Sequence, residues 1–277
     1  MALNFDLAGK VYESTEVTIT AEQIAAYADA SGDPNPRHQP GADQVASLIF
    51  GVVPGWEAMG QVGSDPELGV DNPLMILHGE QEFRYHDVIR PGDTLVITPT
   101  LDSVEDKGKG ATFVSKTAAT RIDGAPVLEA LATIFVRGAG SGQEREKSAP
   151  KPAPQQMAER AKFSSHVDVG MPTVYAEASG DHNPVHLNND VATAVGLPGV
   201  INHGLGTLSL VAGGLAEQLA GGDPAAVSGL RVRFTDMVFP GSDLETTVWE
   251  SDTTGTYLFE TKRPDGATVM SGAIDIR

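Results

Sequence analysis

The sequence contains no cysteine and no long apolar run. Without cysteine, this chain of 277 residues cannot form disulfide bonds, thiolate zinc sites or a cysteine nucleophile. No apolar run approaches the roughly 20 residues that a membrane-spanning helix needs, so we expect no membrane insertion. The first residues lack the basic stretch and apolar core of a secretory signal, and a cytoplasmic location is therefore expected.

Basic residues are also scarce. The chain has 19 Lys and Arg against 37 Asp and Glu, which gives a net charge of -18. Binding of nucleic-acid phosphates requires a positive surface, so no nucleic-acid partner is expected. An anionic ligand would have to be bound by a local basic group or by backbone N–H groups, against the field of the whole chain.

One unit of the sequence occurs twice. The segments Tyr27–His38 and Tyr175–His186 are identical at nine of twelve positions, at an offset of 148 residues. The later segments Arg90–Asp93 and Phe239–Ser242 correspond at an offset of 149. Two landmarks that keep their separation indicate a duplicated unit, and duplication predicts two similar halves related by a pseudo-twofold axis.

Between the two copies, Gly138–Lys162 is rich in Gly, Ser, Pro and charge. Such a composition cannot form a packed core, and alternating prolines favour an extended path. The sequence therefore predicts an N-terminal half over residues 1–137, a linker over 138–162 and a C-terminal half over 163–277.

Each half begins with helices and loops and continues as strands. Thr20 and Gln23 form a candidate capping box before a helix over Ala21–Ser31, and apolar spacing predicts a longer helix over Leu205–Leu219. Gly213-Gly214 within that helix indicates a close packing partner. Strand-like runs separated by turns are Leu74–His78, Gln81–Tyr85, Thr94–Leu101, Ala111–Thr120, Val127–Val136, Leu230–Phe234, Leu244–Glu250, Thr256–Lys262 and Thr268–Ile276. The fold class is thus α+β, an antiparallel sheet covered by a helix in each half.

The residue types needed for proton transfer gather at Asp181, Asn183 and His186. Pro184 forces a turn, so the carboxylate and the imidazole can converge on one water molecule and act as an acid–base pair. The alternative is that Asp181 caps a turn and His186 has no chemical role.

His203-Gly204 follows His186 after 16 residues and opens the apolar helix. The Gly204 N–H lies at the positive end of the helix dipole and is a natural donor to an oxygen that develops negative charge. Taken alone, His203-Gly204 could also be a plain turn into a helix.

Together these residues resemble the MaoC-like, (R)-specific enoyl-CoA hydratases, also called hydratase 2. The match is carried by Tyr175–Gly206, and it extends to Leu230–Asp243 and His78–Asp93, so it covers nearly all of the chain except the linker. The resemblance implies a double hotdog, in which each repeat wraps an antiparallel sheet around a helix. It also implies a lyase of fatty acid metabolism that hydrates trans-2-enoyl-CoA reversibly to the (3R)-3-hydroxyacyl thioester.

The resemblance assigns roles in the C-terminal half. Asp181 would activate water and return a proton to the α-carbon, and His186 would orient and help to deprotonate the same water. The Gly204 amide would hold the thioester oxygen, with Asn183 and His203 in support. No metal or other cofactor is implied, because coenzyme A belongs to the substrate.

The N-terminal half keeps Asp33, Asn35 and His38 but lacks a His-Gly step at a matching distance. In double hotdogs of this type one half usually loses catalysis, and its shortened helix makes room for a bulky acyl chain. We expect this of residues 1–137, with a second working site at Asp33 and His38 as the alternative.

Three further expectations remain open. Arg231 and Arg233 are weak candidates for binding the phosphates of coenzyme A. The alternatives to an enoyl-CoA hydratase are a (3R)-hydroxyacyl dehydratase acting on acyl carrier protein, a hotdog thioesterase, and a non-catalytic acyl-CoA-binding protein. Two fused pseudo-dimers could pair further as a homodimer.

Overall fold

The fold is built around one long antiparallel sheet that both halves of the chain share. The computed structural model describes residues 3–70, 72, 76–142 and 154–277. Within these residues ten strands follow one another in the order β1-β3-β4-β5-β2-β7-β10-β9-β8-β6. The N-terminal half contributes β1 (Thr15–Thr18), β3 (Thr94–Asp106), β4 (Gly110–Arg121), β5 (Pro126–Arg137) and β2 (Ile76–Tyr85). The C-terminal half contributes β7 (Val227–Phe234), β10 (Thr268–Ile276), β9 (Thr256–Lys262), β8 (Asp243–Ser251) and β6 (Gln156–His166).

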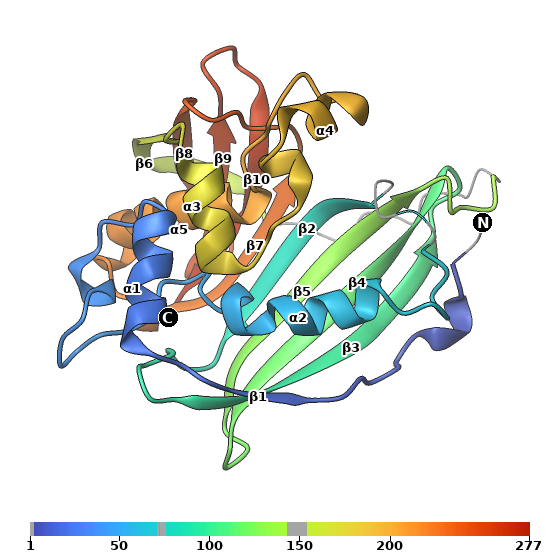
Figure 1. Ribbon diagram of the computed structural model, residues 1–277. Helices are drawn as coiled ribbons and strands as arrows, with labels where there is room; N and C mark the ends of the chain where they lie inside the picture. The colour runs from blue at the N-terminus through green and yellow to red at the C-terminus, as the bar shows by residue number, and fades with distance from the viewer. Residues whose placement is uncertain (1–2, 71, 73–75, 143–153) are drawn as a thin grey trace.

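Helices cover the inner face of this sheet. In Figure 1, α2 lies across β3, β4 and β5, and α5 packs against the strands of the other half. The α-helices are α1 (Ala21–Ala30), α2 (Val52–Gly63), α3 (Met171–Ser179), α4 (Asn189–Ala194) and α5 (Gly204–Ala220), and the short 3-10 helices are η1 (Phe5–Leu7), η2 (Pro36–His38), η4 (Pro184–His186) and η5 (Pro224–Ala226). No helix in the described part of the chain is long and apolar enough to cross a membrane.

Local sequence signals set the helix ends. The capping box is confirmed, because the Thr20 side chain accepts from the Gln23 N–H while the Gln23 side chain accepts from the Thr20 N–H. Pro172 occupies the first turn of α3, where its missing N–H costs nothing. Gly180 ends α3 with φ +84°, a left-handed conformation that favours glycine.

The two halves are related by a pseudo-twofold axis, as the repeat predicts. Tyr27 and Tyr175, equivalent residues of the repeat, meet through their hydroxyl groups at 3.0 Å. Where β2 meets β7, Glu82 faces Arg231, which is 149 residues further along the chain. Equivalent residues can face each other in this way only next to the axis, so the central β2–β7 pair joins the halves like the interface of a fused dimer.

The expected close contact at Gly213-Gly214 is present on two sides of α5. A Cβ atom at Gly214 would lie 2.3 Å from the ring of Phe163, and one at Gly213 would lie 3.0 Å from the carboxyl group of Asp33. The helix therefore approaches both β6 and the first repeat more closely than any larger residue would allow.

The structure corrects the expected linker and strand boundaries. Gln156–Lys162, expected as linker, belongs to β6 and pairs with β8, so the C-terminal half begins before residue 163. This edge strand is exposed along much of its length and shows little apolar alternation, which is why sequence pattern misses it. From residue 76 on, the two expected runs Leu74–His78 and Gln81–Tyr85 form one strand, β2, with an irregularity between His78 and Glu80, whereas residues 74–75 and 143–153 lie outside the described residues.

Candidate active site

The loop after α3 holds Asp181 and His186 in a fixed turn. The Asp181 carboxylate accepts a hydrogen bond from the Asn183 N–H at 3.1 Å, and the Asn183 side-chain oxygen accepts from the Val185 N–H at 3.3 Å. Asn183 thereby caps η4, which Pro184 begins. The sequence D-x-N-P-x-H thus forms two consecutive side-chain turns that place its acid and its histidine on the same side of the loop.

Two histidine rings lie against each other above this loop. The ring centroids of His186 and His203 are 3.9 Å apart. His186 Nδ1 lies 3.0 Å from the Ile201 carbonyl oxygen, and His203 Nε2 lies 2.9 Å from the Asp181 carbonyl oxygen. Because a carbonyl oxygen only accepts, each of these ring nitrogens carries the proton, and His186 Nε2 is left free to accept one from a ligand.

The three side chains form one cluster. A carboxylate oxygen of Asp181 and ring nitrogens of His186 and His203 lie within 4.8 Å of one another. Asp181 and His186 are partly exposed, while His203 is buried with 1% exposure. The first two can therefore reach a ligand, and His203 supports them from behind.

Gly204 is the first residue of α5, directly after His203, so its N–H has no acceptor within the helix. The position of a Cβ atom at Gly204 would be 3.5 Å from the ring of Phe234 on β7. That ring in turn meets the ring of His78 edge-on, with centroids 5.3 Å apart. The helix start thus lies beside Phe234, which His78 of the N-terminal half supports, and the carbonyl-binding role assigned to the Gly204 amide is geometrically available.

Burial shifts the pKa values in the cluster in opposite directions. It raises the pKa of Asp181 above the ordinary 3.8 and lowers the pKa of His186 below the ordinary 6.5. For His203, burial and the neighbouring His186 lower the pKa to about 3. A low dielectric surrounding disfavours every charged form, so burial favours neutral histidines and also raises the pKa of the Asp181 carboxyl.

Arg231 and Arg233, which sequence reasoning associated with coenzyme A, are not brought to this cluster. Their neighbours Leu230 and Val232 are buried in the core, so the two arginines point to the outer face of the sheet. Arg231 forms an ion pair there with Asp275, at 2.7 Å. Strand alternation shows which residues share a face, but sequence alone does not say which face carries the helices.

Two contributors were missed by sequence reasoning. His78 was set aside as a strand residue, yet it stands behind Phe234 at the helix start, with its Nε2 buried and unpartnered among the described residues. Trp56, on α2 of the other half, lies 3.3 Å from the Cβ position of Gly180, next to Asp181. Both come from the N-terminal half, and only the docking of the halves brings them here.

The first repeat holds its Asp and His differently. His38 Nε2 and the Asp33 carboxylate are 3.1 Å apart, with only 2% and 5% of the side chains exposed. Burial alone would lower the pKa of His38, but the hydrogen bond and charge of Asp33 raise it above its ordinary value. The pair is therefore closed upon itself and covered by α5 at Gly213.

Backbone contacts show what replaces His203-Gly204 in the first repeat. The Ala46 N–H donates to Ile89, as the Asn202 N–H donates to Val238, 149 residues beyond Ile89. Ser47 and Leu48 therefore occupy the places of His203 and Gly204.

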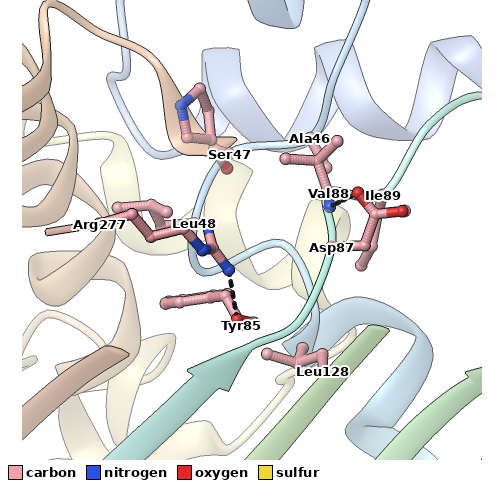
Figure 2. Close-up of a pocket in the computed structure, with 10 residues that line it drawn as sticks. Ala46, Ser47, Leu48, Tyr85, Asp87, Val88, Ile89, Leu128 and Arg277 are labelled. Atoms are coloured by element: carbon pink, nitrogen blue, oxygen red, sulfur yellow. Dashed lines mark hydrogen bonds between the residues drawn. The ribbon is translucent and has the colours of Figure 1, made fainter. Parts of the chain in front are cut away.

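A small cavity lies at this place, and Figure 2 shows Ser47, Leu48 and Tyr85 among the residues around it. It contains neither an imidazole nor a free helix start, because α2 begins only at Val52.

Comparison with known proteins finds relatives of both halves of the chain. The MaoC-like domain family matches residues 152–268, and the FAS1-like dehydratase region matches residues 6–130. A 3-hydroxyacyl-thioester dehydratase Y from Mycobacterium tuberculosis is 32% identical over 212 residues, covering 72% of this chain and 70% of that protein. The chain belongs to the MaoC-like dehydratase family.

Other members of the MaoC-like family match over nearly the full length. A probable enoyl-CoA hydratase 2 from Dictyostelium discoideum is 29% identical over 271 residues, covering 94% of this chain and 92% of that protein. The crystal structure of a MaoC-like dehydratase from Phytophthora capsici superposes with a TM-score of 0.86 at 26% identity, covering 99% and 98% of the two chains. A Mycobacterium tuberculosis protein described as a double hotdog superposes with a TM-score of 0.64 at 15% identity, covering 99% of this chain and 98% of that one. The expected double hotdog is thus confirmed for this MaoC-like chain.

Proposed function

We propose that this chain catalyses the reversible hydration of trans-2-enoyl-CoA to (3R)-3-hydroxyacyl-CoA. The observation that carries the proposal is the convergence of Asp181, His186 and the free Gly204 N–H at the start of α5, within a MaoC-like fold. The pair can activate water, and the amide can stabilise the negative charge that develops on the thioester oxygen.

The chemistry assigns one task to each group. His186 Nε2 and the Asp181 carboxylate hold one water molecule, whose oxygen bonds to C3 of the enoyl group while one of its protons passes to the Asp181 carboxylate. The thioester oxygen becomes an enolate oxygen and accepts from the Gly204 N–H. Asp181 then delivers a proton to C2, so that one water molecule has been added across the double bond and both groups return to their starting state.

Neither step is routed through a metal, and the expectation that no metal is needed remains part of the proposal. Asp181, His186 and His203 are nevertheless residue types that could hold a cation. One nitrogen of each ring is already committed to a backbone carbonyl, which fixes the tautomers that the proton-transfer scheme requires.

We propose that the N-terminal half accommodates the acyl chain and does no chemistry. Support comes from the closed Asp33–His38 pair, from Ser47 in the place of His203, and from the shorter covering helix of 12 residues against 17 in α5. The acyl chain would use the narrow cavity between α2 and the sheet, so this half does not need a wide opening.

A second candidate function is dehydration of (3R)-hydroxyacyl groups on an acyl carrier protein. The similarity to a 3-hydroxyacyl-thioester dehydratase favours this direction of the reaction. The net charge of -18 disfavours docking of an acidic carrier, so coenzyme A is the proposed carrier.

The test is hydration of trans-2-enoyl-CoA by the purified chain, followed as loss of enoyl absorbance and chiral analysis of the product. We expect the 3R alcohol, and His186→Ala should lower kcat/KM about 10²–10⁴-fold while the protein stays folded. A 3S product would contradict the family's stereochemistry for this chain, and full activity of His186→Ala would contradict the site assignment.

Cytoplasmic location, a role in fatty acid metabolism and pairing of two chains remain predictions. A relative from Arabidopsis thaliana is named a peroxisomal enoyl-CoA hydratase 2, so fractionation of the source cells must distinguish the compartments. Gel filtration with light scattering measures whether the fused pseudo-dimer associates further.

A further inference from the structure

A narrow cavity lies between α2 and the sheet of the N-terminal half. Leu205, the residue after Gly204, forms part of its wall, and Trp56 and Met59 of α2 close it from above. Trp56 also reaches to within 3.3 Å of the Cβ position of Gly180, next to Asp181. The cavity therefore lies under α2 and adjoins the start of α5 through Leu205 and the Asp181 loop through Trp56.

The floor of this cavity is polar. Gln81, Ala132 and Ser115 are cross-strand neighbours on β2, β5 and β4, and all three line the cavity. They are 3%, 2% and 1% exposed. Two buried side chains with hydrogen-bonding groups thus flank a small alanine on the floor of the cavity.

The C-terminal half shows which side chains occupy the positions equivalent to Gln81, Ala132 and Ser115 when these positions only contribute to the core. Equivalent residues of the two halves differ by a constant residue number within each strand. The turns at Asp123-Gly124 and Asp265-Gly266 give a difference of 142 for β4 and β5 against β9 and β10, and the pairing of β2 with β7 gives a difference of 149. The equivalent row is then Leu230, Ile274 and Tyr257, which are again cross-strand neighbours on β7, β10 and β9. Leu230 and Ile274 are completely buried there, so the positions equivalent to Gln81 and Ala132 hold large apolar side chains, and the position equivalent to Ser115 holds the partly buried Tyr257.

Ser115 has no partner for its hydroxyl group. Its Oγ is buried and forms no hydrogen bond to any of the described residues. The Gln81 side-chain amide donates to the neighbouring Glu82 carbonyl at 3.3 Å, and the Gln81 side chain also hydrogen-bonds to His78. Burying a hydroxyl without a partner destabilises a protein, and an alanine or leucine would avoid this cost. A ligand that forms a hydrogen bond with the Ser115 hydroxyl would explain why a polar side chain is kept at this position.

We infer that Ser115, together with Gln81, binds an oxygen atom carried by the acyl chain of the substrate. The substrate class is then an enoyl thioester with a hydroxyl or keto group further along the chain than the reacting double bond. This inference rests on the proposed function, because the acyl chain must enter from the Asp181–Gly204 site. Ser115 is a specificity-determining residue in this account and takes no part in the chemistry.

The test compares trans-2-enoyl-CoA substrates of equal chain length with and without one hydroxyl or keto group, moved along successive carbons. At one position we expect kcat/KM about tenfold above that of the unsubstituted chain, the range of a well-placed hydrogen bond. Ser115→Ala should remove this preference. Tyr257→Phe is the matched control, because it removes a hydroxyl group from the equivalent position of the other half and should keep the preference.

The outcomes separate the two proposals. Hydration of unsubstituted chains with no preference at any position overturns the assignment of the polar row, and so does a preference that survives Ser115→Ala. Absence of hydration with every substrate overturns the proposed function itself.

Discussion

Two neighbouring groups at the site respond to the same burial in opposite ways. The buried surroundings raise the pKa of the Asp181 carboxyl and lower the pKa of the His186 imidazole. Each shift disfavours the charged form of its group, so the two pKa values move toward each other. Closer pKa values lower the free energy needed to move a proton between the two groups. His203 behind them stays neutral and donates to the loop carbonyl of Asp181.

These shifts predict the pH dependence of hydration. The reacting form carries an ionised Asp181 and a neutral His186, so kcat/KM should fall from its value near pH 7 as acid protonates the pair. Because burial raises the pKa of Asp181, this fall should begin at a higher pH than an ordinary carboxyl group with a pKa of 3.8 would give. Initial rates across this range, with circular dichroism as the folding control, measure the profile. A midpoint above pH 7 would contradict the assigned protonation states.

Removal of divalent cations is the second prediction at this scale. Since the scheme uses only the proton-transfer groups and the Gly204 amide, dialysis against a chelator should leave kcat/KM unchanged. The measurement is the hydration rate before and after dialysis, with metal content determined on the same sample. Loss of activity that returns with one added cation would show that Asp181, His186 and His203 act as ligands instead.

Among the elements, α5 matters because of where it starts. Its first residue, Gly204, directly follows His203 of the cluster, and glycines let the helix pack closely on β6 and on the first repeat. The first repeat has a turn at residues 48–50 in this place, and its helix begins later, at Val52. A helix start directly after the histidine is what distinguishes the second copy, since both copies keep an aspartate and a histidine.

Gly204→Pro tests the amide directly. Proline is tolerated as the first helical residue, and the extended backbone of His203, with φ -60° and ψ 133°, suits a residue before proline. The variant should keep its fold but lose about 10²–10³ in kcat, as expected for removal of one oxyanion donor.

Gly204→Ala is the matched control for that variant, since it keeps the N–H. Its Cβ atom would make an ordinary contact with Phe234, at 3.5 Å. Equal losses in the alanine and proline variants would show that space at this position matters and that the N–H does not. Thermal unfolding of both variants checks that the helix still forms.

For the whole molecule, sequence predicts the duplication and the composition of the site but not how the halves dock. The repeat locates Asp181 and His186, and the helix pattern locates Gly204. The contributions of Trp56 and His78 depend on contacts between residues far apart in sequence, which no local pattern encodes. Sequence could not say on which face Arg231 and Arg233 lie for a related reason, because the face of the sheet that the helices cover is a tertiary property, and their proposed contact with coenzyme A stays a prediction.

The edge strands show the same limit. β1 is short and β6 is largely exposed, so neither carries the apolar alternation that marks β4 and β5. Both are fixed by pairing with a neighbouring strand, β3 and β8 respectively. Local sequence was sufficient to predict an element where a residue pattern sets the structure, as in the capping box of α1. It was insufficient where the structure is set only by pairing with a neighbouring strand.

The division of labour between the halves is the central claim for the molecule, and one paired measurement tests it. Asp181→Asn and Asp33→Asn make the same change at equivalent positions of the repeat, and each nearly preserves side-chain shape. Steady-state hydration of trans-2-enoyl-CoA should lose about 10²–10⁴-fold in kcat/KM with Asp181→Asn, while Asp33→Asn stays close to wild type with its folding confirmed by thermal unfolding. A comparable loss in a folded Asp33→Asn variant, or substantial activity in Asp181→Asn, would contradict a single working site in the C-terminal half.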